Sequence, residues 1–442
     1  MKAGERMNIV IGPYRVQRRT EYSKYQLYNS STDENITKGN EDILEKIIKD
    51  YELQTRFPER YFKIEDGQLM KVMETPDVKE LDFLFIPEGI TQINRFAVAN
   101  GTFMEVCLPE SLLEIKDAAF EGCQNLKNLI LPDSLFKIGE NAFKNCNKME
   151  TLKLPSNLYY INKWCFYNCK SLKKLVLPDK IFSIRHEAFA HCTSLKSVVF
   201  NKNLEMICNG AFLNCRNLKK IDLPNSVTAI GEYCFADCFK LKEVNLSEKI
   251  LNICNNAFSN CWELENIRLP SNLAIIGNEA FKQCRKLSNL TLPDTVHSLG
   301  FRVFIRTAME SINLPKGLKM VGLPVFSKND IHTLKINGNV ARFGDRTEGK
   351  EGDAKLVNLF NSDILTNTSI NKLEIGHDVI KIDAKTFKFS GEQITEIEYC
   401  GSKSEFEIFK KNNKQLFDLF TNLEKVTIKD DIEKSSIREV ER

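Results

Sequence analysis

The chain has 442 residues, of which 42% are hydrophobic and 27% charged, and its 62 basic and 59 acidic residues leave a formal net charge of +3 at pH 7. This composition excludes collagen-like, mostly disordered and membrane-embedded chains, and no run of about 18 consecutive apolar residues offers a membrane span. The near balance of charge gives no indication of nucleic acid as a partner.

Residues 1–60 lie outside any repeat and are predicted to form an N-terminal segment with a capping helix. The first residues contain no apolar run of the roughly 7–15 residues that a secretory signal needs, which predicts a cytoplasmic protein. Export by a non-classical or effector route is the alternative. Between Asp42 and Gln54, apolar residues follow the spacing of an amphipathic helix. This helix is expected to cover the first edge of the fold, which would otherwise be open to aggregation.

From residue 61 to about residue 400 the chain repeats. Prolines that follow an aliphatic residue stand at Pro87, Pro109, Pro132, Pro155, Pro178, Pro224, Pro270, Pro293 and Pro315. Asn201 and Ser247 occupy the midpoints of the two longer gaps, and Asn337 continues the series, so every interval is 22 or 23 residues. A register kept over this length is typical of a solenoid.

One unit, residues 131–154, shows what each copy contributes. Its last six residues alternate apolar and polar towards Leu154, as a short strand with one buried face does. Pro155 then ends the strand because it has no backbone donor. The spacing of a single inward-packed helical turn is found at Ala142, Phe143 and Cys146. Each unit is therefore predicted to be one strand plus a short turn or helix, which buries its apolar face only by stacking on copies of itself.

The whole repeat, Leu-Pro-x-x-Leu-x-x-Ile-Gly-x-x-Ala-Phe-x-x-Cys-x-x-Leu-x-x-Leu-x-Leu-Pro, resembles the BspA-like leucine-rich repeat family over about residues 60 to 400. Its Ala-Phe-x-x-Cys core is matched, for example, at Ala119/Phe120/Cys123 and at Ala280/Phe281/Cys284. The resemblance implies a leucine-rich-repeat solenoid, that is, a parallel β-solenoid with short helical turns, which binds other macromolecules. Many members of that family are surface-exposed or secreted and mediate adhesion.

The repeat register breaks after Asn337. A charged, Gly-rich insertion near residues 341–366 is predicted to be a loop on the flank of the solenoid, which spans residues 61–400. Residues 401–442 are predicted to form a C-terminal capping helix, which places Phe406, Phe409 and Phe420 on one face, followed by a charged tail from Lys429. Helical caps are thus expected at both ends.

Eight of the fourteen cysteines occupy the Cys position of the repeat. Stacking at about 4.8 Å would arrange them in a ladder, close enough for disulfides by distance. Packing as small apolar side chains, occasional disulfides and metal binding all remain open, and packing is favoured. The pairs Cys165/Cys169 and Cys234/Cys238 lack the Cys-x-x-Cys spacing of zinc sites. Free thiols would suit a reducing compartment.

No pattern indicates an enzyme. His186 and His191 are five residues apart rather than the four that place two ligands on one helix face, and nucleotide-binding glycine loops are absent. We expect no catalytic residue, no bound metal and no cofactor. The leading hypothesis is a non-catalytic protein–protein interaction module or scaffold. The alternative is a secreted or host-directed effector, or a surface adhesin, that uses the repeats for recognition.

Two columns of side chains are candidates for binding a protein partner. The position after the first leucine of the strand carries Lys127, Lys173, Lys196, Lys219 and Lys242. Stacked like charges are mildly destabilising, so the column is either a solvated, edge-protecting face or a strip for an acidic partner surface. The position after the leucine that follows the proline carries Phe136, Tyr159 and Phe182. These aromatic residues form either an exposed interaction patch or a contact for the N-terminal helix. We expect a monomer whose partner docks across both columns, at residues 127–242.

Overall fold

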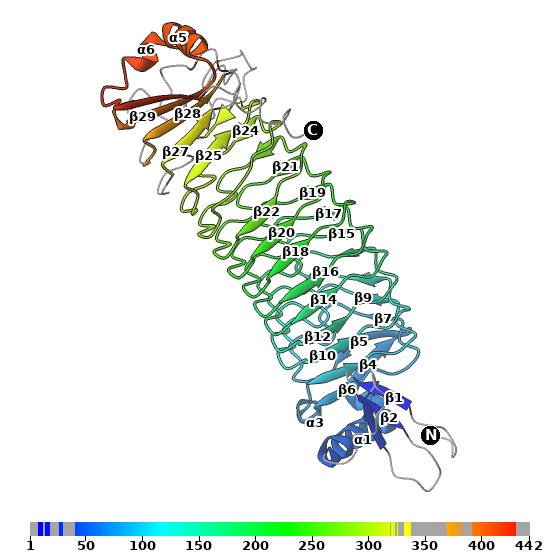
Figure 1. Ribbon diagram of the computed structural model, residues 1–442. Helices are drawn as coiled ribbons and strands as arrows, with labels where there is room; N and C mark the ends of the chain where they lie inside the picture. Colours follow the sequence, from blue (N-terminus) through cyan, green and yellow to red (C-terminus); the bar gives the residue numbers. More distant parts are fainter. Residues whose placement is uncertain are drawn as a thin grey trace, which may run out of the picture. The chain divides into compact units, whose positions relative to one another are not determined.

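The structure is a computed structural model that describes residues 40–318, 320–322, 325, 331–336, 369–377, 379, 382 and 391–429, together with the backbone at 8–11, 14–17 and 26–29. It comprises two compact units, Met1–Leu218 (unit 1) and Lys219–Arg442 (unit 2). The three short N-terminal strands, β1 (Asn8–Ile11), β2 (Tyr14–Gln17) and β3 (Gln26–Asn29), form an antiparallel sheet in unit 1 (Figure 1).

Both units are parallel β-solenoids in which most described rungs contribute one strand to each of two sheets (Figure 1). The first-sheet strands of unit 1 are β6 (Phe83–Phe85), β8 (Glu105–Cys107), β10 (Asn128–Ile130), β12 (Thr151–Lys153), β14 (Lys174–Val176) and β16 (Ser197–Val199). Its second-sheet strands are β5 (Gln68–Val72), β7 (Gln92–Ile93), β9 (Glu114–Ile115), β11 (Lys137–Ile138), β13 (Tyr160–Ile161), β15 (Ser183–Ile184) and β17 (Met206–Ile207). The solenoid predicted from the 22–23-residue period is confirmed.

Unit 2 continues the same plan. Its first-sheet strands are β18 (Lys220–Asp222), β20 (Glu243–Asn245), β22 (Asn266–Arg268), β25 (Ser311–Leu314), β27 (Thr333–Ile336), β28 (Lys372–Gly376), β29 (Glu396–Cys400) and β30 (Lys425–Lys429). Its second-sheet strands are β19 (Ala229–Ile230), β21 (Asn252–Ile253), β23 (Ile275–Ile276), β24 (Ser298–Leu299) and β26 (Met320–Val321). The insertion predicted near residues 341–366 lies outside the described residues.

The Ala-Phe-x-x-Cys segment is a run of hydrogen-bonded turns rather than a helical turn. Asn141 and Asn145 have left-handed φ angles of 56° and 63°. The amides of Asn141, Phe143 and Asn145 therefore point to the next rung and donate to its carbonyls at 3.1, 2.9 and 2.8 Å. A helix would need those amides for its own ladder, so the inter-rung bonds exclude it.

A column of phenylalanines fills the core of each unit. In unit 1, rings of successive rungs from Phe120 to Phe212 stack at 5.1 to 5.7 Å between centroids, with interplanar angles of 3° to 12°. In unit 2 the stack from Phe235 to Phe304 has spacings of 5.6 to 6.0 Å. Each ring is fully buried, which contributes about 1.5–3 kcal/mol per side chain.

The predicted N-terminal helix is present as α1 (Glu41–Arg56), followed by α2 (Pro58–Tyr61). The apolar face of α1 packs on the edge strand β6, where Leu44 and Ile47 contact Phe83 and Phe85. The hairpin of β4 (Phe62–Glu65) and β5 begins the second sheet, and α3 (Pro76–Lys79) precedes β6.

At the C-terminal end, the predicted helix is divided into α5 (Lys403–Asn412) and α6 (Lys414–Phe417), after a short 3-10 turn, η2 (Gly391–Gln393). Phe406 and Phe409 pack on Tyr399 of β29. The chain then adds a further strand, β30, parallel to β29, so a strand that the sequence did not predict follows the helices. The charged tail from residue 430 lies outside the described residues.

Candidate functional site

The predicted lysine column of unit 1 lies on the surface just before the first-sheet strands. Lys127, Lys173 and Lys196 are exposed, and the amide of Lys196 donates to the carbonyl of Lys173 at 2.9 Å, which places them on adjacent rungs. Lys173 forms an ion pair with Glu150. This hydrogen bond and the lysine charge lower the pKa of the Glu150 carboxyl. Within the described part of the chain, Lys127 and Lys196 form no ion pair, so much of the column's charge is uncompensated.

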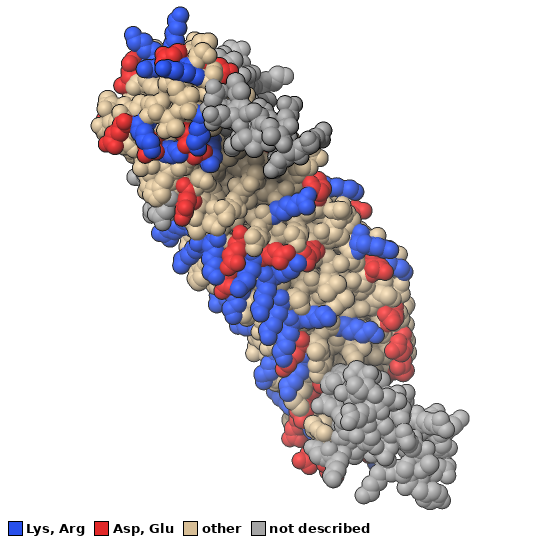
Figure 2. Space-filling view, in the orientation of Figure 1, with Lys and Arg blue, Asp and Glu red and all other residues tan. Residues whose placement is uncertain are grey.

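Further lysines that the sequence reasoning missed surround this column. Lys148 and Lys170 precede the column by two or three residues, and Lys153 and Lys174 point outward from β12 and β14; all four are exposed. We call the group of Lys127, Lys148, Lys153, Lys170, Lys173, Lys174 and Lys196 the lysine face. The space-filling view shows basic side chains gathered over these first-sheet strands, with acidic side chains among them (Figure 2). Lys153 and Lys174 could have been predicted from the sequence, because they occupy the polar positions of strands in which apolar and polar residues alternate.

In unit 2 the same column carries two further lysines. Lys219 and Lys242 lie on adjacent rungs, joined by a backbone hydrogen bond of 2.9 Å, and Lys242 pairs with Glu263 at 3.7 Å. Beside them the rings of Phe239 and Trp262 stack at 4.2 Å between centroids. The column continues into Glu265 on the next rung, as it includes Glu150 in unit 1, so it has two lysines here and three in unit 1.

The predicted aromatic column is exposed: Phe136, Tyr159 and Phe182 have 51%, 53% and 42% of their surface accessible. The interpretation that these side chains pack under the N-terminal helix is wrong, because α1 packs on β6 instead. Leu113, which is 42% exposed, occupies the same position one rung earlier. The sequence reasoning missed it because only aromatic residues were considered. We call Leu113, Phe136, Tyr159 and Phe182 the apolar ridge.

The lysine face and the apolar ridge flank different sheets. Lys173 comes directly before the first-sheet strand β14, whereas Phe182 comes directly before the second-sheet strand β15, after the turn at Pro178. In unit 1 the two columns therefore lie beside different strands of each rung, and docking of one partner across both stays a prediction.

A shallow hollow of about 470 Å³ adjoins the ridge at Phe182. Phe182 and Met206 line it together with the charged residues Glu140, Lys163, Arg185 and Glu205. Arg185 lies over the ring of Tyr160 at 4.1 Å. Met206 is itself 46% exposed. The hollow is thus lined by both apolar and charged side chains.

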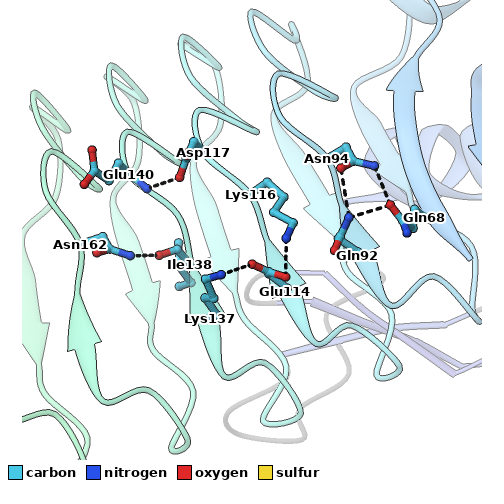
Figure 3. A network of polar contacts seen from close by, with 10 residues as sticks. All are labelled: Gln68, Gln92, Asn94, Glu114, Lys116, Asp117, Lys137, Ile138, Glu140 and Asn162. Carbon is cyan, nitrogen blue, oxygen red and sulfur yellow. Dashed lines mark hydrogen bonds and ion pairs between the residues drawn. The ribbon is translucent and has the colours of Figure 1, made fainter.

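Polar side chains also form ladders across the second sheet (Figure 3). Glu114 accepts a hydrogen bond from Lys116 and forms an ion pair with Lys137, each at 2.7 Å. These two partners lower the pKa of Glu114, and the Glu114 carboxylate raises the pKa of Lys137. Further along, the carboxylate of Asp117 accepts from the amide of Glu140 at 2.9 Å. The contacts of Glu114 with Lys137 and of Asp117 with Glu140 run from rung to rung, so they stabilise the stack.

The cysteines are free thiols, and those of the repeat pack in the core and donate hydrogen bonds. The thiols of Cys146, Cys169 and Cys192 each donate to a phenylalanine carbonyl of the preceding rung at 3.3 Å. Burial raises the pKa of Cys192 to about 12, far above the range of a nucleophilic thiolate. Among the described residues, no cluster of three or more His, Cys, Asp or Glu side chains could hold a metal ion. No helix in the described ranges is long and apolar enough to span a bilayer.

Comparison with known proteins places this geometry among leucine-rich repeats. The profile of a BspA type leucine rich repeat region matches in six copies, over residues 77–194, 160–285 and 229–347. A similar solved structure is a leucine-rich repeat protein from Bacteroides ovatus, with 23% identity, 62% of this chain and 91% of that chain covered, and a TM-score of 0.45. No curated protein sequence matches significantly.

Two further solved structures are similar at 19% identity. One is a leucine rich cell surface protein from Faecalibacterium prausnitzii, with 79% of this chain and 95% of that chain covered and a TM-score of 0.43. The other is the pneumococcal vaccine antigen PcpA, with 78% and 79% covered and a TM-score of 0.42.

Proposed function

Because this chain belongs to the BspA-type leucine-rich repeat family, we propose that it is a non-catalytic protein-interaction module whose lysine face binds an acidic surface of a partner protein. The observation that carries this proposal is the lysine face itself. Seven exposed lysines cover neighbouring rungs of unit 1, and Glu150 forms the ion pair with Lys173 in their midst. Like charges on adjacent rungs, such as Lys173 and Lys196, cost stability, which the ion pair with Glu150 offsets only in part.

Lysine, rather than arginine, fits a broad acidic surface. A lysine ammonium is a strongly hydrated point charge, whereas arginine favours bidentate pairing with one carboxylate. Each lysine contributes modestly and in a salt-dependent way, and the summed field accelerates association. The lysine face therefore acts as an electrostatic guide for the partner.

Affinity capture with the full chain tests the proposal. Lys173→Glu/Lys196→Glu is compared with Lys202→Glu/Lys249→Glu, which makes the same change of charge at exposed turn positions. We expect the first variant to reduce the association rate of the captured partner by about tenfold or more and to flatten its dependence on salt. The control should keep both. Equal rates for the two variants would contradict the proposal.

We place this module in a reducing compartment, a proposal that its fourteen free thiols support. Trapping of thiols with a mass-tagged maleimide in freshly lysed source cells, followed by denaturation, should label all fourteen. Two or more native disulfides would contradict the proposed compartment.

A further inference from the structure

The apolar ridge exposes four large side chains on four consecutive rungs of unit 1. Each of them directly precedes a second-sheet strand: β9, β11, β13 or β15. Neighbouring strands of a sheet lie about 4.8 Å apart, so the ridge residues recur at about 4.8 Å along the unit.

This spacing is close to the pitch of an α-helix, which is about 5.4 Å per turn. Residues on one face of an extended strand are about 6.6 Å apart. Over three steps along the ridge, a helix drifts from the rungs by about 2 Å, whereas a strand drifts by about 5 Å. A helix can present one apolar side chain to every rung, and an extended segment cannot.

The backbone beneath the ridge also disfavours an extended partner. The amide of Phe136 donates to the carbonyl of Leu113 at 3.1 Å, and that of Phe182 donates to Tyr159 at 2.9 Å. The carbonyl of Phe182 accepts in turn from the amide of Glu205 at 2.8 Å. An added strand needs a free sheet edge, and these groups are already bonded within the sheet. A helix brings its own satisfied backbone hydrogen bonds.

We propose that the apolar ridge binds an amphipathic α-helix of the partner protein, with apolar residues at positions i, i+4, i+7 and i+11 seated on successive rungs. The proposal rests on the proposed function, to which it adds the structure of the partner segment. The hollow at the end of the ridge, between Phe182 and Met206, takes a fifth apolar side chain.

The charged residues beside the ridge indicate which charge the partner helix carries on its flank. Three residues before the ridge side chains, on the proline turns, stand the exposed carboxylates of Glu110, Asp133 and Asp179. The Asp133 carboxylate accepts from the amide of Ser156 at 3.1 Å, and none of the three forms an ion pair within the described ranges. Lys180 is the one basic side chain on these four turns. The helix is therefore expected to carry Lys or Arg on the side that faces the turns.

Two display libraries of matched composition test this inference against the full chain. One library places apolar residues at i, i+4, i+7 and i+11, and the other at i, i+2, i+4 and i+6. We expect the tighter binders to come from the helical library. Their Kd should rise by about tenfold or more with Phe136→Ser/Phe182→Ser, since buried aromatic anchors dominate interfaces. It should stay unchanged with Leu251→Ser, a matched control at the same repeat position in unit 2, where the side chain is 53% exposed.

Tighter binding by the strand-patterned library would overturn the inference, as would helical binders that are insensitive to the ridge variant, or no saturable binding by either library. Competition separates this inference from the proposed function. The selected helical peptide should displace the partner captured through the lysine face. If capture still depends on Lys173 and Lys196 but the peptide does not displace the partner, the proposed function stands and the helix inference fails.

Discussion

At the scale of single residues, the repeated cysteine is a packing residue that also donates a hydrogen bond. Repeat thiols donate to a carbonyl of the preceding rung, for example Cys215 to Phe189 at 3.3 Å and Cys123 to Val98 at 3.1 Å. A larger side chain would not fit beside the stacked rings, and alanine would leave out the donor. This dual role explains a cysteine at this position without a disulfide or a metal.

The burial of the thiols predicts their reactivity. Ten cysteines are buried, and four are partly exposed, namely Cys107, Cys208, Cys254 and Cys400. We expect a colorimetric thiol reagent to label no more than four thiols in the native protein and all fourteen after denaturation, because reaction requires access and an ionised thiolate. Labelling of most thiols before unfolding would contradict the packed ladder.

Glu105 predicts a pH dependence of stability. Its side chain is buried on β8, accepts from Asn128 at 2.8 Å, and leaves its other carboxylate oxygen without a partner. Burial raises the pKa of Glu105 to about 7. The unfolded state therefore binds fewer protons than the native state between about pH 4.5 and pH 7, and the free energy of unfolding falls by up to about 3 kcal/mol as pH rises through that window.

Denaturant unfolding at pH 5 and pH 8 measures this loss. Glu105→Gln keeps the shape and the bond with Asn128 but removes the titration, so its unfolding free energy should change less between the two pH values. The buried Asp50, whose pKa is also raised by burial, is common to both proteins and cancels in the comparison. An equal pH dependence in the two proteins would show that Glu105 is not responsible.

At the scale of elements, α1 caps the edge strand β6 with side chains in place of a neighbouring strand. The carboxylate of Asp50 accepts from the amides of Asp82 and Phe83 at 3.1 and 3.2 Å. Gln54 donates to the carbonyl of Phe83 at 2.8 Å and accepts from the amide of Phe85 at 2.9 Å. An exposed edge is a template for pairing with another chain, and these bonds occupy it.

Removal of this cap should have two consequences. Gln54→Ala leaves one buried amide and one buried carbonyl of β6 without partners, which costs about 1–3 kcal/mol for each group, and it should promote self-association. Denaturant unfolding and light scattering measure the two effects. Glu45→Ala, on the exposed face of α1, is the control. If Gln54→Ala is as stable and as monodisperse as the control, the edge-capping role is refuted.

The sequence predicted the elements unevenly, for physical reasons. The repeat period, the register of the first-sheet strands and helix α1 could be predicted from the spacing of apolar residues, because the buried side chains determine that spacing. The second-sheet strands escaped prediction since two residues, such as Lys137 and Ile138, are too short for an alternation to be recognised. The turns at Asn141 and Asn145 looked helical because both conformations bring Ala142, Phe143 and Cys146 inward. β30 was missed because it follows the helices and lies outside the repeat register.

For the candidate site, the sequence predicted which side chains are exposed but not how the two columns are arranged on the solenoid. Position within the repeat was enough to expect Lys173 and Phe182 on the surface. Their placement beside different sheets depends on the second strand, which had not been predicted. The partner-binding role of both columns, and the domain boundaries at residues 60 and 400, stay predictions.

At the scale of the whole molecule, each rung contacts only its neighbours, so a local defect should stay local. Phe166→Ala removes a fully buried ring that stacks on Phe143 and Phe189. The expected cost is about 3–5 kcal/mol. Hydrogen–deuterium exchange should increase in the rungs around residue 166 and remain unchanged in unit 2. An increase spread evenly over both units would contradict a nearest-neighbour fold.

The central claim is that unit 1 binds a partner through the lysine face and the apolar ridge. Hydrogen–deuterium exchange of the full chain, alone and with its captured partner, tests it most directly. We expect protection at the rungs that carry these side chains, from Leu113 to Met206, with little change in α1 or in β30. Protection confined to the ends of the chain, or to unit 2, would contradict the claim.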